Sequence, residues 1–103
     1  MIARAWSARA TLAGATAYEL HFRASVLPAL ARLAGHCGAQ LLRCDDGDRV
    51  ELRVVTYWES IEAIARFAGA DPEAAVVEHD ARAALISYDA RVTHLQVVAD
   101  TTR

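Results

Sequence analysis

His79 lies between two acidic residues in the segment Glu78-His79-Asp80. A neighbouring carboxylate can orient an imidazole for proton transfer or for metal binding, and histidine is the side chain that changes its charge most readily near neutral pH. The alternative interpretation is a histidine in a solvated loop. We take His79 as the candidate catalytic base.

The other histidines are weaker candidates. His94 lies in an alternating stretch near the C-terminus, where we expect it to be half-buried, either beside a ligand or satisfied by a neighbouring group. His21 and His36 are expected to be exposed. Because no HxH or HExxH spacing joins the four histidines, the sequence indicates no preassembled metal site.

Aromatic side chains are the candidates for binding a flat apolar ligand, by stacking and by burial of area. The candidates for lining a pocket are Trp6, Phe22, Tyr57, Trp58 and Phe67. The alternative is that they form the core, and for Trp58 core packing is the better explanation. Arg4 and Arg53 could hold an anionic or phenolate group if they turn inward, whereas outward they are solvated. The alternation of side chains along the strands does not decide whether Arg4 and Arg53 point inward or outward.

The charge pattern argues against nucleic acid and membranes as partners. The formal net charge is −2, and the arginines are scattered from Arg4 to Arg103 without a cluster. No segment approaches the ~20 apolar residues that span a bilayer.

The two cysteines cannot pair within the chain, because Cys37 and Cys44 would lie ~23 Å apart in one predicted strand. We therefore expect a cytoplasmic protein with free thiols.

The elements that must position these residues follow from local patterns. Residues 1–10 alternate in side-chain character with a period of two and predict a strand. Apolar residues at helical spacing then predict a long helix that ends at Gly35. This helix should kink near 25–28, because Pro28 lacks a backbone donor. Residues 37–44 and 49–58 flank the turn Asp-Asp-Gly-Asp and predict a hairpin. A helix capped by Ser60 and ended by Gly69 follows, and a second helical piece is predicted for 72–77. We expect 80–88 to be mainly irregular and 91–99 to form the last strand.

This order, βαββαβ, predicts an α+β, ferredoxin-like domain over 1–103, with an antiparallel sheet and both helices on one face. The strand at 49–58 is partly apolar on both faces, so the second face should also be covered. The chain has 103 residues, of which 54% are hydrophobic. So small a domain leaves much of its apolar surface unburied by its own fold. We therefore expect a homodimer that joins two sheets face to face.

Several segments together resemble the antibiotic biosynthesis monooxygenase family: MIARAW at the start, the hairpin LLRCDDGDRVELRVVTYW, ESIEAIARFAG after it and VTHLQVV at the end. The resemblance spans nearly the whole chain in the right order. It implies a dimeric α+β barrel with a pocket between the helices and the sheet of each subunit. Several members oxidise polycyclic aromatic substrates with no metal or flavin, some degrade haem, and many have no assigned reaction. On this basis no cofactor is expected.

The haem-degrading branch of that family is recognised by three residues: an asparagine on the first strand, a tryptophan in the helix after the hairpin and a histidine that ligates iron. Only the histidine has a counterpart here, in His79. Phe67 stands where the tryptophan would be, and the first strand offers Trp6 and Ser7 in place of asparagine.

The function expected from the resemblance is cofactor-independent monooxygenation of a small quinol- or polyketide-like aromatic substrate. His79 would remove a proton, the electron-rich carbanion would react with oxygen, and the pocket would supply desolvation and charge stabilisation. Two alternatives stay open. One is a non-catalytic dimer that binds a small apolar molecule, and the other is a haem-binding protein that uses His79.

Overall fold

The sheet is organised around its first strand, β1 (Ile2–Thr11), in a computed structural model that describes residues 1–101. On one side β1 pairs along its whole length with β3 (Arg49–Trp58), which pairs in turn with β2 (His36–Asp46). On the other side it pairs with β4 (Ser87–Tyr88) and β5 (Thr93–Gln96). All pairings are antiparallel, and the five-stranded sheet has the order β2-β3-β1-β4 with β5 also beside β1.

The predicted hairpin is confirmed, with a tighter turn than the sequence suggested. β2 continues to Asp46 and β3 begins at Arg49, so the connection is Gly47-Asp48. Gly47 has φ of 64°, a value that favours glycine and suits a two-residue hairpin turn. Cys37 and Cys44 both lie on β2, exposed and as free thiols.

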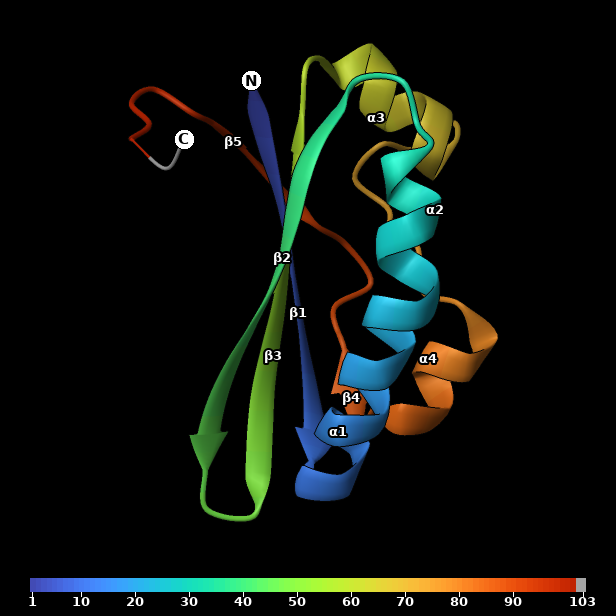
Figure 1. The fold of residues 1–103 in the computed structure, drawn as a ribbon, viewed down its shortest axis with the longest axis vertical. Helices are drawn as coiled ribbons and strands as arrows, with labels where there is room; N and C mark the ends of the chain where they lie inside the picture. The colour runs from blue at the N-terminus through green and yellow to red at the C-terminus, as the bar shows by residue number, and fades with distance from the viewer. Residues whose placement is uncertain (102–103) are drawn as a thin grey trace.

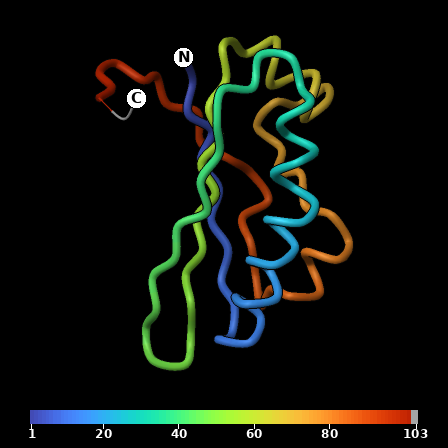
Figure 2. Tube along the Cα trace, in the orientation of Figure 1, coloured from blue at the N-terminus to red at the C-terminus, as the bar shows by residue number. Residues whose placement is uncertain are grey.

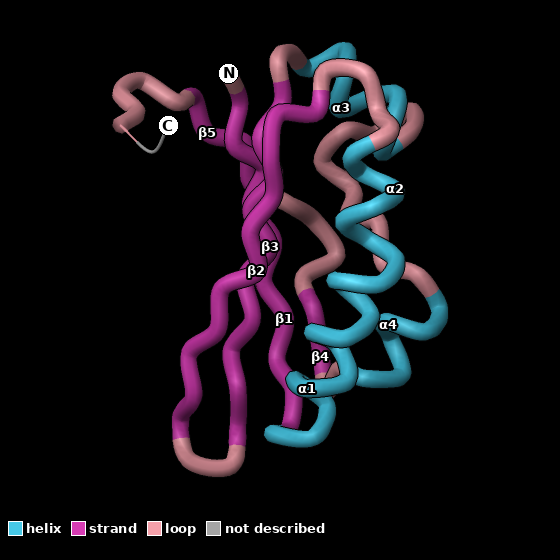
Figure 3. Tube along the Cα trace, in the orientation of Figure 1, coloured by secondary structure: helices cyan, strands magenta, loops and turns pink. Residues whose placement is uncertain are grey.

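The first helical column runs across one face of the sheet as α1 (Leu12–His21), the π-helical segment η1 (Phe22–Val26) and α2 (Leu27–Ala31) (Figure 3). It begins at Leu12, because the Thr11 hydroxyl caps it by accepting a 3.0 Å hydrogen bond from the Gly14 amide. The irregularity also lies about a turn earlier than the predicted kink. The Leu27 amide donates to the Phe22 carbonyl, a π-helical step just before Pro28.

The helix after the hairpin, α3 (Ile61–Ala68), has the predicted boundaries, with Ser60 as its cap and Gly69 at its end. The helical piece predicted for 72–77 is wrong. That segment is a turn followed by extended chain, in which the Ala75 amide donates to the Ala90 carbonyl at 2.9 Å and the Val92 amide to the Glu73 carbonyl at 2.8 Å. Pairing with the C-terminal segment therefore takes the hydrogen-bonding groups that a helix would use.

The second helix of the βαββαβ order is completed by α4 (His79–Ala84), within the region predicted to be mainly irregular. The last strand is shorter than predicted, and its end has a simple cause. Gln96 is paired with Ile2, the first residue of β1, so the chain beyond it has no strand to pair with. Val98 is accordingly 91% exposed.

Within residues 1–101 all helices lie on one face of the sheet, and the other face of this described part carries none (Figures 1 and 2). The core between the helices and the sheet divides into two clusters. One is built around Trp6, Tyr18, Phe22 and Leu52, and the other around Leu30, Trp58 and Ile64. The fold is therefore the expected ferredoxin-like α+β arrangement. Among the described residues no helix has the length and apolar character needed to cross a membrane.

Candidate functional site

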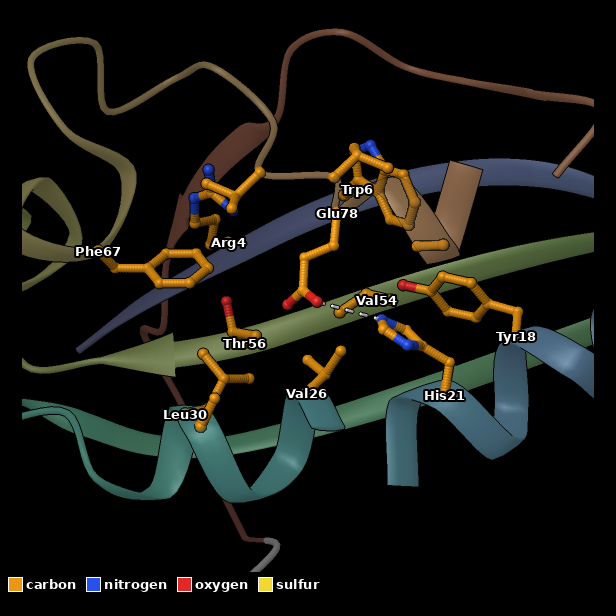
Figure 4. Close-up of a pocket in the computed structure, with 14 residues that line it drawn as sticks. Arg4, Trp6, Tyr18, His21, Val26, Leu30, Val54, Thr56, Phe67 and Glu78 are labelled. Atoms are coloured by element: carbon orange, nitrogen blue, oxygen red, sulfur yellow. Dashed lines mark ion pairs between the residues drawn. The ribbon is translucent and has the colours of Figure 1, made fainter. Parts of the chain in front are cut away.

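A pocket lies between the helical column and the inner face of the sheet, where the two core clusters meet (Figure 4). Its cavity volume is about 80 Å³. The walls are Arg4, Trp6, Tyr18, His21, Val26, Ala29, Leu30, Val54, Thr56, Phe67, Val76, Val77, Glu78 and Ala81. An apolar pocket with a few polar groups is the usual form of a small-molecule site.

One end of the pocket is aromatic and carries a phenol. Trp6, on β1, donates from Nε1 to the Asp89 carbonyl at 2.7 Å, and its ring centroid lies 6.1 Å from that of Tyr18 on α1. Burial, together with the negative charge of Glu78, raises the pKa of Tyr18 to about 12. The Tyr18 hydroxyl points into the pocket (Figure 4) and stays protonated at neutral pH, so it can donate a hydrogen bond to a ligand.

His21 and Glu78 face each other at the centre of the pocket. His21 Nε2 lies 3.7 Å from Glu78 Oε2 (dashed line in Figure 4). The His21 side chain is only 13% exposed, whereas that of Glu78 is 57% exposed. His21 Nε2 is buried and has no hydrogen-bond partner among the described residues. The pair thus places an imidazole inside the pocket, with a carboxylate reaching it from the solvent side.

The expectation that His21 is exposed is wrong, and the π-helical segment gives the reason. His21 immediately precedes this segment, and Val26 is its last residue. A π-helical turn takes up more residues than an α-helical one, so residues five apart can share a face. His21 and Val26 therefore both line the pocket.

Glu78 is brought to His21 by the packing of α4 against α1. The contact depends on Gly14 in the first turn of α1, where a Cβ atom would collide with the Ala84 carbonyl oxygen at the end of α4. Glu78 is the N-cap residue of α4. The close approach of the two helices thus sets Glu78 beside the α1 residues Tyr18 and His21.

The opposite end of the pocket holds a buried cation, Arg4 on β1, which is 6% exposed. Its Nη2 donates to the Ala74 carbonyl at 2.7 Å, and its guanidinium carbon lies 5.4 Å from the centroid of the Phe67 ring. Its Nε is buried and has no hydrogen-bond partner within residues 1–101. Burial lowers the pKa of Arg4, although a guanidinium keeps its charge at neutral pH.

The structure places two of the five aromatic candidates in the pocket, Trp6 and Phe67. Phe22 and Trp58 are 3% and 0% exposed and belong to the core. Trp58 stacks on Phe67 with the ring centroids 5.4 Å apart, so it supports a wall without forming one. Tyr57 lies on the other face of the sheet, where its hydroxyl donates to Gln40 Oε1 at 3.0 Å.

Neither histidine proposed for the site is among the residues that line this pocket. His79 is the first residue of α4 and is exposed, next to Glu78 in the chain. His94, on β5, is half-buried and pairs in register with Arg4. Burial and the positive charge of Arg4 lower the pKa of His94. The roles expected for these two histidines stay predictions.

Sequence reasoning did not assign a role to Tyr18, His21 or Glu78. Tyr18 falls within the long helix that the sequence predicts, as one of its apolar positions. Glu78 was considered only as the acidic neighbour of His79. The one available signal was the spacing from Tyr18 to His21, since residues three apart in a helix share a face. Within residues 1–101 no group of three or more His, Cys, Asp or Glu side chains could hold a metal ion.

Comparison with solved structures identifies haem degraders of the same fold. A mutant of MhuD with two manganese protoporphyrin IX molecules per active site superposes with a TM-score of 0.62 and 26% identity, covering 100% of both chains. MhuD from Mycobacterium tuberculosis with two haems in its active site has a TM-score of 0.59 and 29% identity, covering 98% of this chain and 99% of that one. No protein-family model and no curated protein matches the sequence. The expected resemblance therefore holds at the level of the superfamily of ABM-like dimeric α+β barrels, to which these neighbours belong.

Proposed function

We propose that this protein is a cofactor-independent monooxygenase that oxidises a small aromatic substrate in the pocket between helices and sheet. The observation that carries the proposal is the His21–Glu78 pair, 3.7 Å apart on the wall of an otherwise mostly apolar pocket. An imidazole held beside a carboxylate is a common general base, and an apolar pocket favours a reaction that consumes a desolvated anion.

The reaction class follows from the groups in the pocket. His21 takes a proton from the activated methylene of an anthrone-like substrate, and Glu78 stabilises the imidazolium that forms. Tyr18, as a neutral donor, stabilises the negative charge that develops on the substrate oxygen. The carbanion transfers electrons to O₂. One oxygen atom becomes the new carbonyl, and the other leaves as water with the two hydrogens of the methylene, so no external reductant is needed.

Oxygen uptake tests this proposal. Purified protein is incubated with a panel of anthrones and quinols, and oxygen consumption is compared with that of the substrates alone. With an anthrone, the proposal predicts protein-dependent uptake and a quinone product whose new carbonyl contains one labelled atom from ¹⁸O₂. Quenching of the Trp6 fluorescence by panel members without any uptake would instead support the non-catalytic binding protein.

Haem binding is a second candidate, because both solved neighbours carry haem or manganese porphyrin. The donor set does not fit it in the way the resemblance implies. His79, the expected ligand of iron, is exposed and does not line the pocket, and the Nε2 atom of His21 faces Glu78. Titration with haem decides the matter. A shifted Soret band at one equivalent, lost in His79→Ala or His21→Ala, would favour haem over the aromatic substrate.

The homodimer expected from the sequence belongs to the same proposal. The face of the sheet without helices presents apolar side chains from four strands: Ala5, Leu42, Val55, Tyr57 and Leu95. Leu42 and Leu95 are 47% and 51% exposed in the single chain. A second copy of this face would cover them, as sheet packing commonly does. Light scattering should give a dimer mass, and Val55→Arg should give the monomer mass.

A further inference from the structure

Among the residues that the structure describes, Arg4 is a buried charge without a counter-charge. It donates a hydrogen bond to the Ala74 carbonyl and contacts the face of the Phe67 ring. No carboxylate pairs with it within residues 1–101, and its Nε has no partner there. Burying an unpaired charge opposes folding, because the group loses its hydration and gains no opposite charge. A bound anion would supply the missing opposite charge.

The surroundings of Arg4 make the imbalance specific to this end of the pocket. Its cross-strand neighbours on β3 and β5 are Thr56, which is neutral, and His94. Burial and the charge of Arg4 lower the pKa of His94, and Glu73, which is paired with Arg91 at 3.6 Å, raises it. The one carboxylate that lines the pocket, Glu78, is paired with His21. In Figure 4 Arg4 lies beside Phe67, apart from the dashed His21–Glu78 pair near Val54.

The planar neighbours favour a flat ligand. Phe67 lies under the guanidinium at 5.4 Å and stacks on Trp58, and Trp6 forms the wall further along β1. A guanidinium binds a carboxylate or phenolate through parallel hydrogen bonds in its own plane. The aromatic ring of a ligand so held would extend along the apolar wall toward Trp6 and Tyr18.

We propose that Arg4 is the recognition site for the anionic group of the substrate, so that the pocket takes a flat aromatic acid whose carboxylate or phenolate pairs with the Arg4 guanidinium. The inference rests on the proposed function, because it names the substrate class for the same pocket. The anion completes the hydrogen bonding of Arg4, and the ring is thereby oriented with its reacting carbon toward His21.

A pair of probes that differ only in charge tests the inference by binding. The probes are 2-naphthoate and its neutral counterpart 2-naphthamide, titrated into the full chain and followed by calorimetry. The wild type should prefer 2-naphthoate by about tenfold or more, the range of a hydrogen-bonded charge. Arg4→Met should abolish that preference, whereas Arg53→Met, on the opposite face, should keep it. Arg4→Lys should keep part of it, since the charge remains without the planar fork.

A second readout does not depend on any variant. Because the charge of Arg4 lowers the pKa of His94, an anion bound to Arg4 should raise the pKa of His94, measured by NMR titration of its ring protons. Equal affinity of the wild type for both probes, absence of binding, or a preference that survives Arg4→Met would overturn the inference. Preferential binding of 2-naphthoate without oxygen uptake on any panel substrate would keep the inference and reject the monooxygenase.

Discussion

Arg4 and Arg53 lie on neighbouring strands of one sheet, yet they meet opposite conditions. Arg53 is on the face without helices, with a side chain 62% exposed and 3.2 Å from Glu51. Arg4 is on the helix-covered face, 6% exposed and without a carboxylate partner among the described residues. An exposed ion pair contributes little to stability, whereas a buried unpaired charge opposes it. The difference indicates that the inner face is shaped for a ligand at some cost to stability.

The largest difference between the two faces is expected in the free energy of unfolding when an aromatic residue on each face is replaced by alanine. Trp58 is 0% exposed, whereas Tyr57 lies on the outer face and is partly exposed. Trp58→Ala should lower the free energy of unfolding by about 3–5 kcal/mol, because it leaves a cavity beside Phe67 and Ile64. Tyr57→Ala should lower it by about 1 kcal/mol or less when both variants are compared as monomers in the Val55→Arg background, because the dimer would cover Tyr57. Urea unfolding followed by circular dichroism measures both, and similar losses would remove the distinction between the faces.

Tyr18 should make the stability depend on alkaline pH. Its pKa is about 12 in the folded chain and about 10 when unfolded, so the unfolded state loses the proton first. The stability is therefore complete below pH 10 and falls by about 2–3 kcal/mol between pH 10 and 12. Tyr18→Phe should remove most of this fall. Glu78→Gln should lower the pKa of Tyr18, because it removes the second cause of the shift.

Ultraviolet titration of tyrosinate absorbance gives the pKa directly. The wild type should show one tyrosine that ionises near pH 12, and this step should be missing in Tyr18→Phe. If all the tyrosines ionise together near pH 10, Tyr18 is not buried as described.

Arg4→Met should stabilise the protein without ligand, by about 1–3 kcal/mol, because an apolar side chain of similar length replaces an uncompensated charge. Arg53→Met should change the stability by less than about 0.5 kcal/mol when both variants are compared as monomers in the Val55→Arg background, because Arg53 lies on the face that the dimer would cover. Thermal unfolding in the absence of ligand compares them. A clear loss of stability in Arg4→Met would mean that its contacts with Ala74 and Phe67 outweigh its burial.

The features that sequence could predict are those fixed by neighbouring residues. The hairpin follows from two apolar runs around Gly47, and α3 from Ser60 and Gly69. The segment 72–77 could not be predicted in the same way, because its backbone groups bond to the distant residues Ala90 and Val92. Local propensity favoured a helix there, and long-range pairing prevailed.

The candidate site was harder to predict because its residues come from several elements. Arg4 shares the parity of Trp6 on β1, but alanines on the other face made both faces look apolar. The position of His21 depends on the π-helical segment, which no local sequence pattern predicted. The sequence favoured His79 as the catalytic residue because it has acidic neighbours. In the structure Glu78 lines the pocket and His79 is exposed.

The most direct test of the account compares the two histidines beside Glu78. Oxygen uptake is measured on the most active anthrone or quinol with the wild type, His21→Ala, Glu78→Gln and His79→Ala, each checked for folding. Loss of a general base should reduce kcat by about 10²–10⁴-fold. We predict that loss for His21→Ala, a smaller one for Glu78→Gln, and nearly unchanged turnover for His79→Ala. Turnover that survives His21→Ala but is lost in His79→Ala would contradict the account.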